Sequence, residues 1–316
     1  MISRIDQRDY DEIDNIVTSM DNGRAVLELY RAAREITISP LCFSAAREIE
    51  NVGAGSVFIL TGFPVIIGET PLCETDGPLG VVRLVHGLSL LGMDVYTITS
   101  GIYGNNLLKL LNAEEEKTKC MIFRDLKHIE REMKDVLKKF SPDILISVEL
   151  PGKAHDGRYY DMYNNDITPY VVPLDDMIEM ACDYGVRTIG IGDGGNEAGM
   201  GWVADAVTKH VANGSRIASR IKTDSLVVAS TSNWGAYGIL TALSNLSGKQ
   251  LLCNGRYEDK LFADANSLRL YDGKLREVKP SVDGFTLEDS KEIVSKLRDL
   301  VKFDDLASAG DKLKSV

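Results

Sequence analysis

The sequence lacks long apolar segments, and this argues against a protein that is inserted in a membrane. No run of about 18 apolar residues occurs, so we predict no membrane-spanning helix. The first residues, MISRIDQRDYDEID, carry too many charges for a secretory signal. We therefore expect a cytoplasmic protein without a membrane partner.

Cysteine is scarce, and positive charge is outweighed by negative charge. The five cysteines are scattered without a C-x-x-C pair, which favours reduced thiols over a disulfide framework or a zinc site. The sequence has 36 basic and 47 acidic residues, and the resulting formal net charge of −11 argues against nucleic acid as a partner. A small anionic metabolite could still bind where a metal ion or helix N-termini reverse the local field.

The hydrophobic pattern changes near residue 53. Residues 1–52 are predicted to form a helical N-terminal extension packed on the core, and residues 53–316 a single α/β catalytic domain with a C-terminal helix. Short apolar runs alternate there with amphipathic segments, which predicts a three-layer αβα fold with a mainly parallel, Rossmann-like sheet. The predicted strands cover residues 56–60, 94–99, 119–123, 143–148, 187–191 and 225–229. The predicted helices cover residues 78–91, 126–140, 173–184, 199–211 and 234–246.

Four polar, glycine-rich segments directly follow predicted strands. Ligands of open parallel sheets bind beyond the carboxyl ends of the strands, so these four loops should gather at one edge. The segments are TGFPVIIGETPLCETDGPLG (61–80), ELPGKAHDGRYYDMYNNDIT (149–168), GDGGNEAGMG (192–201) and STSNWGAYG (230–238). Their convergence predicts the position of an active site.

The loop 192–201 is acidic as well as rich in glycine. A G-x-G-x-x-G match begins at Gly190, but this residue lies inside a predicted strand. Asp193 and Glu197 would also repel a pyrophosphate, so we reject a dinucleotide site. An acidic loop of this kind favours a cation instead.

Oxygen-bearing side chains in this loop predict a divalent cation site. Asp193, Asn196 and Glu197 are spaced at i, i+3 and i+4, and Glu149 or Glu74 could complete the ligand set. Oxygen ligands without cysteine indicate Mn²⁺ or Mg²⁺ as the cofactor. The simpler alternative is that Asp193 caps the next helix and Glu197 is its first-turn charge.

Side chains of the neighbouring loops are candidates for catalysis and substrate binding. Glu149, Asp193 and His155 are the candidate catalytic groups, although Glu149 could be an ordinary strand-end charge and His155 an exposed histidine. The candidate substrate-binding residues place polar groups near loop or helix starts, where an anion could bind, and Asp76 could instead be a helix cap. These candidates are Thr61, Gly62, Asp76, Asp156, Tyr160, Ser232 and Asn233.

In their order and spacing, the motifs TGF…ETDGPLG, PG…DG.YY…DI, IGDGGNEAGMG and SNWGAYG resemble the D-glutamate cyclase-like domain family. The resemblance covers about residues 53–260. It implies a lyase that closes D-glutamate, or a related amino acid, to 5-oxo-D-proline with loss of water. Leu150 and Asp161 depart from the family pattern, in which we expect a basic residue and an amide.

The leading hypothesis is a metal-dependent enzyme of this type, in which the cation polarises the γ-carboxylate of the substrate and Glu149 takes a proton from the attacking amine. A Mg²⁺- or Mn²⁺-dependent phosphatase acting on a small phosphoester is the first alternative, because clustered carboxylates and helix N-termini serve that reaction too. A non-catalytic metabolite or metal sensor is the third hypothesis. An oligomer is compatible with each of them.

Overall fold

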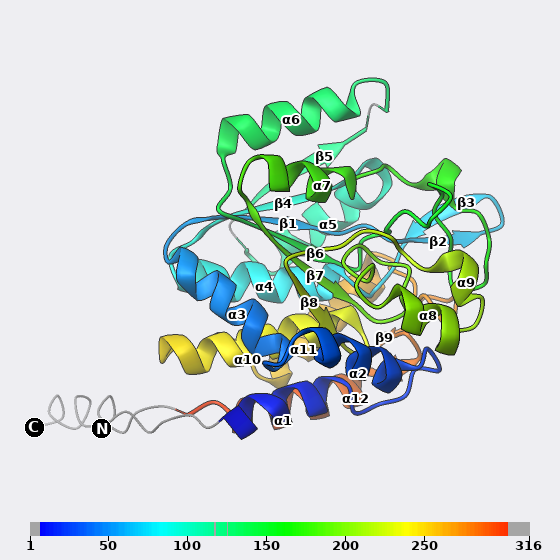
Figure 1. The fold of residues 1–316 in the computed structure, drawn as a ribbon. Coiled ribbons are helices and arrows are strands. Elements are labelled where there is room, and N and C mark those ends of the chain that lie inside the picture. The colour runs from blue at the N-terminus through cyan, green and yellow to red at the C-terminus, as the bar shows by residue number, and fades with distance from the viewer. Residues whose placement is uncertain (1–6, 117, 125, 303–316) are drawn as a thin grey trace, which may run out of the picture.

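The computed structural model describes residues 7–116, 118–124 and 126–302, and its centre is a six-stranded parallel sheet (Figure 1). The strands lie in the order β5-β4-β1-β6-β7-β8, and every neighbouring pair is parallel. Their bounds are β1 Ser56–Leu60, β4 Asp94–Ser100, β5 Lys119–Phe123, β6 Ile144–Val148, β7 Arg187–Gly192 and β8 Ser225–Val228. Each coincides with a predicted strand to within one residue at either end. The order of strand addition reverses between β1 and β6, which is the position where doubly wound folds bind ligands.

The helices of the described residues cover both faces of this sheet. Their bounds are α1 Gln7–Val17, α2 Val26–Ile36, α3 Leu41–Val52, α4 Pro78–Leu90, α5 Gly101–Ala113, α6 Ile129–Phe140, α7 Asp176–Asp183, α8 Ala204–His210, α9 Gly214–Ile217, α10 Ser232–Ser247, α11 Gly255–Ser267 and α12 Leu287–Asp299. A short 3₁₀ helix, η1, covers Thr168–Tyr170. Within the described ranges, no helix is long and apolar enough to cross a membrane.

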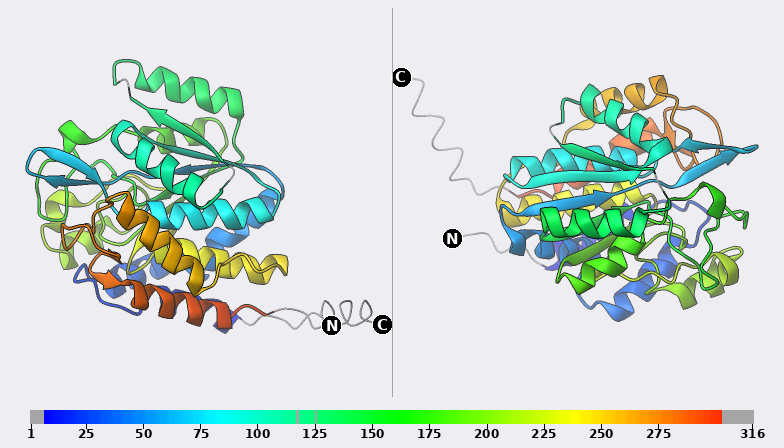
Figure 2. Two further views of the ribbon diagram at one scale, coloured as in Figure 1. Left: turned by 180° about the vertical axis from the view of Figure 1, so that it is seen from behind. Right: turned by 90° about the horizontal axis from the view of Figure 1, so that it is seen from above.

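Two hydrophobic cores lie on opposite faces of the sheet, because alternate residues of a strand point to opposite sides. Val57 and Ile59 of β1 belong to the larger core, whereas Phe58 and Leu60 belong to the smaller one. Helices α3, α4, α5 and α10 bury the larger core, with α1, α11 and α12 packed against them, and α6 and α7 bury the smaller core (Figures 1 and 2). This confirms the predicted three-layer α/β architecture.

The predicted helix over residues 199–211 begins late. The structure has bends, turns and isolated β-bridges up to Val203, and α8 starts only at Ala204. Gly199 has a φ of +108°, and a Cβ added to it would lie 2.8 Å from the Gly190 Cα. The chain therefore needs glycine here to turn tightly over β7, which excludes a helix that starts at residue 199.

Several elements were not predicted from the sequence. Inside the loop that follows β1, the strands β2 (Pro64–Ile67) and β3 (Thr70–Cys73) form an antiparallel hairpin that projects from the body of the molecule (Figure 2). Each strand has only four residues and includes a proline, so the pattern resembles an irregular loop. Helices α5 and α11 and the small β9–β10 pair (Ser281–Val282 and Phe285–Thr286) were also missed.

The segment between α1 and α2 extends to the carboxyl edge of the sheet. Ser230, which follows β8, holds it in place, because its N–H donates to the Val17 carbonyl (2.8 Å) and its hydroxyl to the Met20 carbonyl (2.6 Å). Asn22 returns a bond from its side-chain amide to the Ser230 carbonyl (2.8 Å). The next residues of this segment therefore lie beside the loops that follow the strands.

Candidate active site

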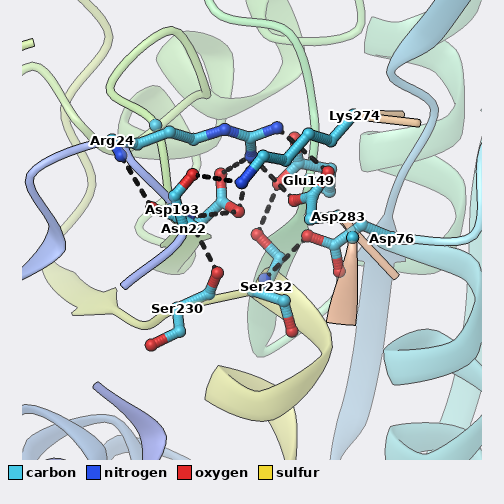
Figure 3. A network of polar contacts seen from close by, with 12 residues as sticks. Asn22, Arg24, Asp76, Glu149, Asp193, Ser230, Ser232, Lys274 and Asp283 are labelled. Carbon is cyan, nitrogen blue, oxygen red and sulfur yellow. Dashed lines mark hydrogen bonds and ion pairs between the residues drawn. The ribbon is translucent and has the colours of Figure 1, made fainter. Parts of the chain in front are cut away.

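The four predicted loops meet at the carboxyl edge of the sheet, where strand order reverses. Thr61 follows β1, Glu149 follows β6, Asp193 follows β7 and Ser232 begins α10 after β8. All four residues are buried. Figure 3 shows how the side chains of Glu149, Asp193 and Ser232 approach one another.

Glu149 lies at the centre of this edge. Its φ of 44° places a non-glycine residue in the left-handed region, a conformation that costs about 1–3 kcal/mol and is often found at functional sites. The Ser232 hydroxyl donates to Glu149 Oε2 (2.6 Å). Burial, followed by the negative charges of Glu197 and Asp193, raises the pKa of Glu149 well above its ordinary value. A carboxyl group whose pKa is raised holds a proton more readily than an ordinary glutamate, as a general acid–base group requires.

Asp193 is paired with Arg24, a residue of the α1–α2 segment (Figure 3). Arg24 Nη1 lies 2.6 Å from both Asp193 oxygens, and the same guanidinium contacts the two oxygens of Asp283 at 2.7 and 2.9 Å. Burial raises the pKa of Asp193 to about 7, although Arg24 opposes this shift. Burial also raises the pKa of Asp283 well above its ordinary value.

Glu197 and Asn196 do not join Asp193 in one three-residue ligand set. The Glu197 carboxylate accepts the N–H groups of Gly194 (2.9 Å) and Gly195 (2.7 Å), so it stabilises its own loop. The Asn196 amide donates to the Tyr160 carbonyl (2.8 Å), and its Oδ1 is buried without a hydrogen-bond partner. The i, i+3, i+4 spacing placed both residues near Asp193 but did not predict these backbone bonds.

Two groups of buried carboxylates have the proximity that a cation site needs. Ligand oxygens lie within 4.8 Å of one another in Glu149, Asp193 and Glu197, and again in Asp76, Asp193 and Asp283. Arg24 forms ion pairs with Asp193 and Asp283. Within the described ranges, however, the other three carboxylates of these groups, those of Asp76, Glu149 and Glu197, form no salt bridge. A set of oxygen donors with excess negative charge fits a hard divalent cation such as Mg²⁺ or Mn²⁺.

Asp76 and Asn233 cap each other's helices. The Asp76 carboxylate accepts the N–H groups of Ser232 and Asn233 at the start of α10, each at 2.9 Å. The Asn233 side-chain oxygen accepts the N–H groups of Gly77 (3.0 Å) and Gly80 (2.6 Å) at the start of α4. These backbone donors are therefore bound by side chains and are not free for an anionic ligand. Burial raises the pKa of Asp76 to about 7.

A cavity of about 280 Å³ opens beside these groups. Four polar residues of the site, Arg24, Glu74, Glu149 and Asn196, line this cavity. The other lining residues are Asn22, Gly23, Phe63, Pro64, Val65, Ile66, Asp161, Met162, Tyr163, Ala212, Asn213, Gly273, Lys274 and Arg276. Burial, followed by the charges of Asp283 and Asp76, raises the pKa of Glu74 well above its ordinary value. The cavity is small and mixed in polarity, which suits a small polar metabolite.

Thr61 and Gly62 do not line this cavity, and their backbone N–H groups are already hydrogen-bonded. The Thr61 N–H donates to the Ile98 carbonyl (3.2 Å), and the Gly62 N–H to the Glu149 carbonyl (3.4 Å). The Thr61 hydroxyl is buried without a partner. A Cβ added to Gly77 would lie 2.5 Å from that hydroxyl, so the loop before α4 needs glycine there.

His155, Asp156 and Tyr160 are not part of the cavity wall. His155 is exposed, and Asp156, also exposed, accepts the Tyr160 hydroxyl (2.6 Å). Tyr160 is buried and touches the site only through its carbonyl, which holds the Asn196 amide. These positions do not support a role for His155 in proton transfer in this conformation.

The two departures from the family pattern differ in position. Leu150 is buried in the smaller hydrophobic core and does not line the cavity. Asp161 does line it, and its carboxylate holds the loop by accepting the N–H groups of Tyr163 (2.9 Å) and Asn165 (2.8 Å). Of the two, Asp161 is therefore positioned to affect which ligand fits.

Arg24 and Asp283 are the members of the site that the sequence did not indicate. Arg24 belongs to the segment between two amphipathic helices, and Asp283 lies in the β9–β10 turn, where Asp-Gly is an ordinary turn sequence. Neither follows a strand of the central sheet. Only the tertiary fold brings them together.

The strand order and the buried carboxylates at its reversal point define a doubly wound α/β protein with an acidic ligand site. Residues 6–298 match the sequence model of the family described as D-glutamate cyclase-like, C-terminal, so the chain belongs to this family. The match extends on both sides beyond residues 53–260 and includes the N-terminal helices that carry Arg24 to the site.

A curated relative is also similar in sequence. Over 201 residues the chain is 37% identical to the mitochondrial D-glutamate cyclase of Homo sapiens. The aligned region covers 60% of this chain and 33% of the human protein. The chain thus spans about a third of the length of that relative. These comparisons give no support to the phosphatase alternative.

Proposed function

We propose that this protein closes D-glutamate, or a related amino acid, to 5-oxo-D-proline with loss of water, as a metal-dependent enzyme. Family membership and the human relative support the reaction class. The observation that carries the proposal is Glu149, a buried carboxyl group with a raised pKa that lines the cavity. No observation favours phosphoester hydrolysis, because the helix N-termini at the site are already capped.

The reaction needs two proton transfers and no external redox partner. The amino nitrogen attacks the γ-carboxyl carbon and forms the C–N bond, while one C–O bond breaks and its oxygen leaves as water. The substrate ammonium group loses two protons in becoming a ring amide, and the leaving oxygen gains two. A single carboxyl group that alternately accepts and donates protons can therefore complete the reaction.

Glu149 is the group we assign to this proton transfer. Its raised pKa makes the protonated form more accessible than in an ordinary glutamate, so the carboxyl group can donate a proton as well as accept one. The Ser232 hydroxyl fixes Oε2, so the orientation of the carboxyl group is defined before the substrate binds. The unusual backbone at Glu149 supports the same orientation.

Asp193, Glu149 and Glu197, or Asp193 with Asp76 and Asp283, would hold the divalent cation. A bound cation would act as a Lewis acid that withdraws electron density from a carboxylate oxygen of the substrate. Asp193 belongs to both groups of carboxylates, so we expect it to be the ligand that is hardest to replace.

The direct test is to incubate the purified protein with D-glutamate and Mn²⁺ or Mg²⁺ and to follow 5-oxo-D-proline by mass spectrometry. We expect product with at least one of the two ions, and loss of product in Glu149→Gln. Chiral separation of the product reports whether L-glutamate, used as a matched substrate, also reacts. Unchanged D-glutamate with both ions would refute the proposal.

A further inference from the structure

Two hydrogen-bond acceptors in the cavity wall have no donor. Glu74 Oε1 and Asn196 Oδ1 are buried without a partner, in side chains that are 6% and 2% exposed. Both residues line the same cavity. A buried polar atom without a hydrogen bond costs about 1–3 kcal/mol, so two such acceptors in residues that line one cavity indicate a ligand that supplies donors.

The surroundings of the two side chains differ in how they determine the position of each acceptor. The Asn196 amide nitrogen donates to the Tyr160 carbonyl, which requires the side-chain oxygen to be on the other side. Glu74 Oε2 lies 2.7 Å from the position of a Cβ on Gly273, so any larger residue at 273 would displace the Glu74 carboxylate. The Asn196 oxygen is therefore oriented by the fold, and Gly273 leaves the room that the Glu74 carboxylate occupies.

Glu74 belongs to neither of the two groups of carboxylates that are close enough to share a cation. A divalent cation needs several oxygen ligands around one point, and those groups provide them without Glu74 or Asn196. A primary ammonium group has different needs, because it carries one positive charge and three N–H donors. One carboxylate and one amide oxygen match it in both charge and hydrogen bonding.

We propose that Glu74 and Asn196 form the amine-binding part of this cavity and that the ligand is a small amino acid bound through its ammonium group. This inference rests on the proposed function, since it assigns the binding of the reacting amine. Phe63 and Val65 supply an apolar wall for the methylene groups of such a ligand. Lys274 and Arg276, both exposed, supply positive charge for a carboxylate at the mouth of the cavity.

The test compares two ligands that differ by the amino group. Binding of D-glutamate and of glutarate, which lacks the amine, is measured by calorimetry in the Glu149→Gln protein, where turnover is blocked. We expect D-glutamate to bind about 10- to 100-fold more tightly than glutarate, as for a lost hydrogen bond to a charged group. Adding Glu74→Gln should remove most of this preference and leave glutarate binding nearly unchanged.

Glu69→Gln is the matched control, because Glu69 lies exposed on the β2–β3 turn and its loss changes the net charge equally. It should keep the full preference for D-glutamate. If Glu74→Gln does not fold, Glu74→Asp retains the charge but withdraws it by one methylene, and we expect an intermediate preference.

Three outcomes would overturn the inference: a preference that survives Glu74→Gln, no preference in the parent protein, or no binding of either ligand. Failure of the proposed reaction is a separate result. It would appear as absence of 5-oxo-D-proline with the wild-type protein, while the preference for the amine-bearing ligand persisted in the binding assay.

Discussion

Two buried ionic networks involve helix α4 but differ in how their charges are balanced. The first surrounds Arg83, whose guanidinium contacts Glu258 (3.1 Å) and Glu114 (3.2 Å). The remaining carboxylate oxygens accept the Tyr237 hydroxyl (3.0 Å) and the Lys260 ammonium (2.8 Å). All four carboxylate oxygens are therefore bonded. The second network lies before α4, at the cavity, where acidic groups outnumber the basic ones and acceptor atoms have no partner.

The difference separates a structural network from a functional one. A buried ion pair that is fully bonded holds elements together but has no capacity for a ligand. The cavity network keeps carboxyl groups buried close to one another, which is unfavourable without a counter-charge and raises their pKa values. Such an arrangement is expected where charge is completed by a substrate or a cation.

The largest expected effect is on catalysis by Glu149→Gln. Glutamine keeps the shape of the side chain and can still accept the Ser232 hydroxyl, but it does not exchange protons. We expect turnover of D-glutamate to fall by about 100- to 10,000-fold, with the midpoint of urea unfolding equal to or above that of the wild type. A rate close to wild type would show that another group transfers the proton.

The balanced network predicts the opposite outcome for Arg83→Met. Removing the guanidinium leaves Glu258 and Glu114 with incomplete pairing in the interior, so the free energy of unfolding should fall by about 3–5 kcal/mol in urea titrations. The activity per folded molecule should be unchanged. Arg83→Lys, which keeps the charge, is the matched control and should lose less stability; equal losses would indicate that packing, and not charge, dominates.

Cation binding should distinguish the two networks as well. Mn²⁺ at a concentration about 100 times its Kd should increase the stability of the wild type by about 2.7 kcal/mol, which differential scanning calorimetry detects as a higher melting temperature. Asp193→Asn should remove this increase, because Asp193 belongs to both carboxylate groups. Asp205→Asn, an exposed position on α8, should retain it. An equal increase in both variants would place the ion elsewhere.

The sequence predicted the position of the cavity network, but not which residues within it form contacts with one another. Strand and helix periods predicted the sheet and the four converging loops, and the position after a strand identified Glu149 and Asp193. The contribution of Arg24 depends on the packing of α1 and on the hydrogen bonds that Met20 and Asn22 form with Ser230, which lies 210 and 208 positions after them in the chain. Local patterns carry no signal for such contacts. The reciprocal caps of Asp76 and Asn233 were missed for the same reason, since each side chain serves a helix distant in sequence.

The smallest expected effect concerns His86, which borders the balanced network on α4. Hydrogen bonds with the Cys253 side chain and the Glu116 carboxylate raise the pKa of His86 from 6.5 to about 10. Because the folded state binds this proton more tightly than the unfolded state, the stabilisation is complete below about pH 6.5 and is lost as the pH rises towards 10. The pair is partly exposed, so we expect a loss of less than about 1 kcal/mol between pH 6.5 and 9.5. Urea unfolding at the two pH values should show this loss in the wild type and in the control His155→Gln, but not in His86→Gln. If His86→Gln responded to pH like the wild type, the protonated histidine would contribute nothing to the stability of this network.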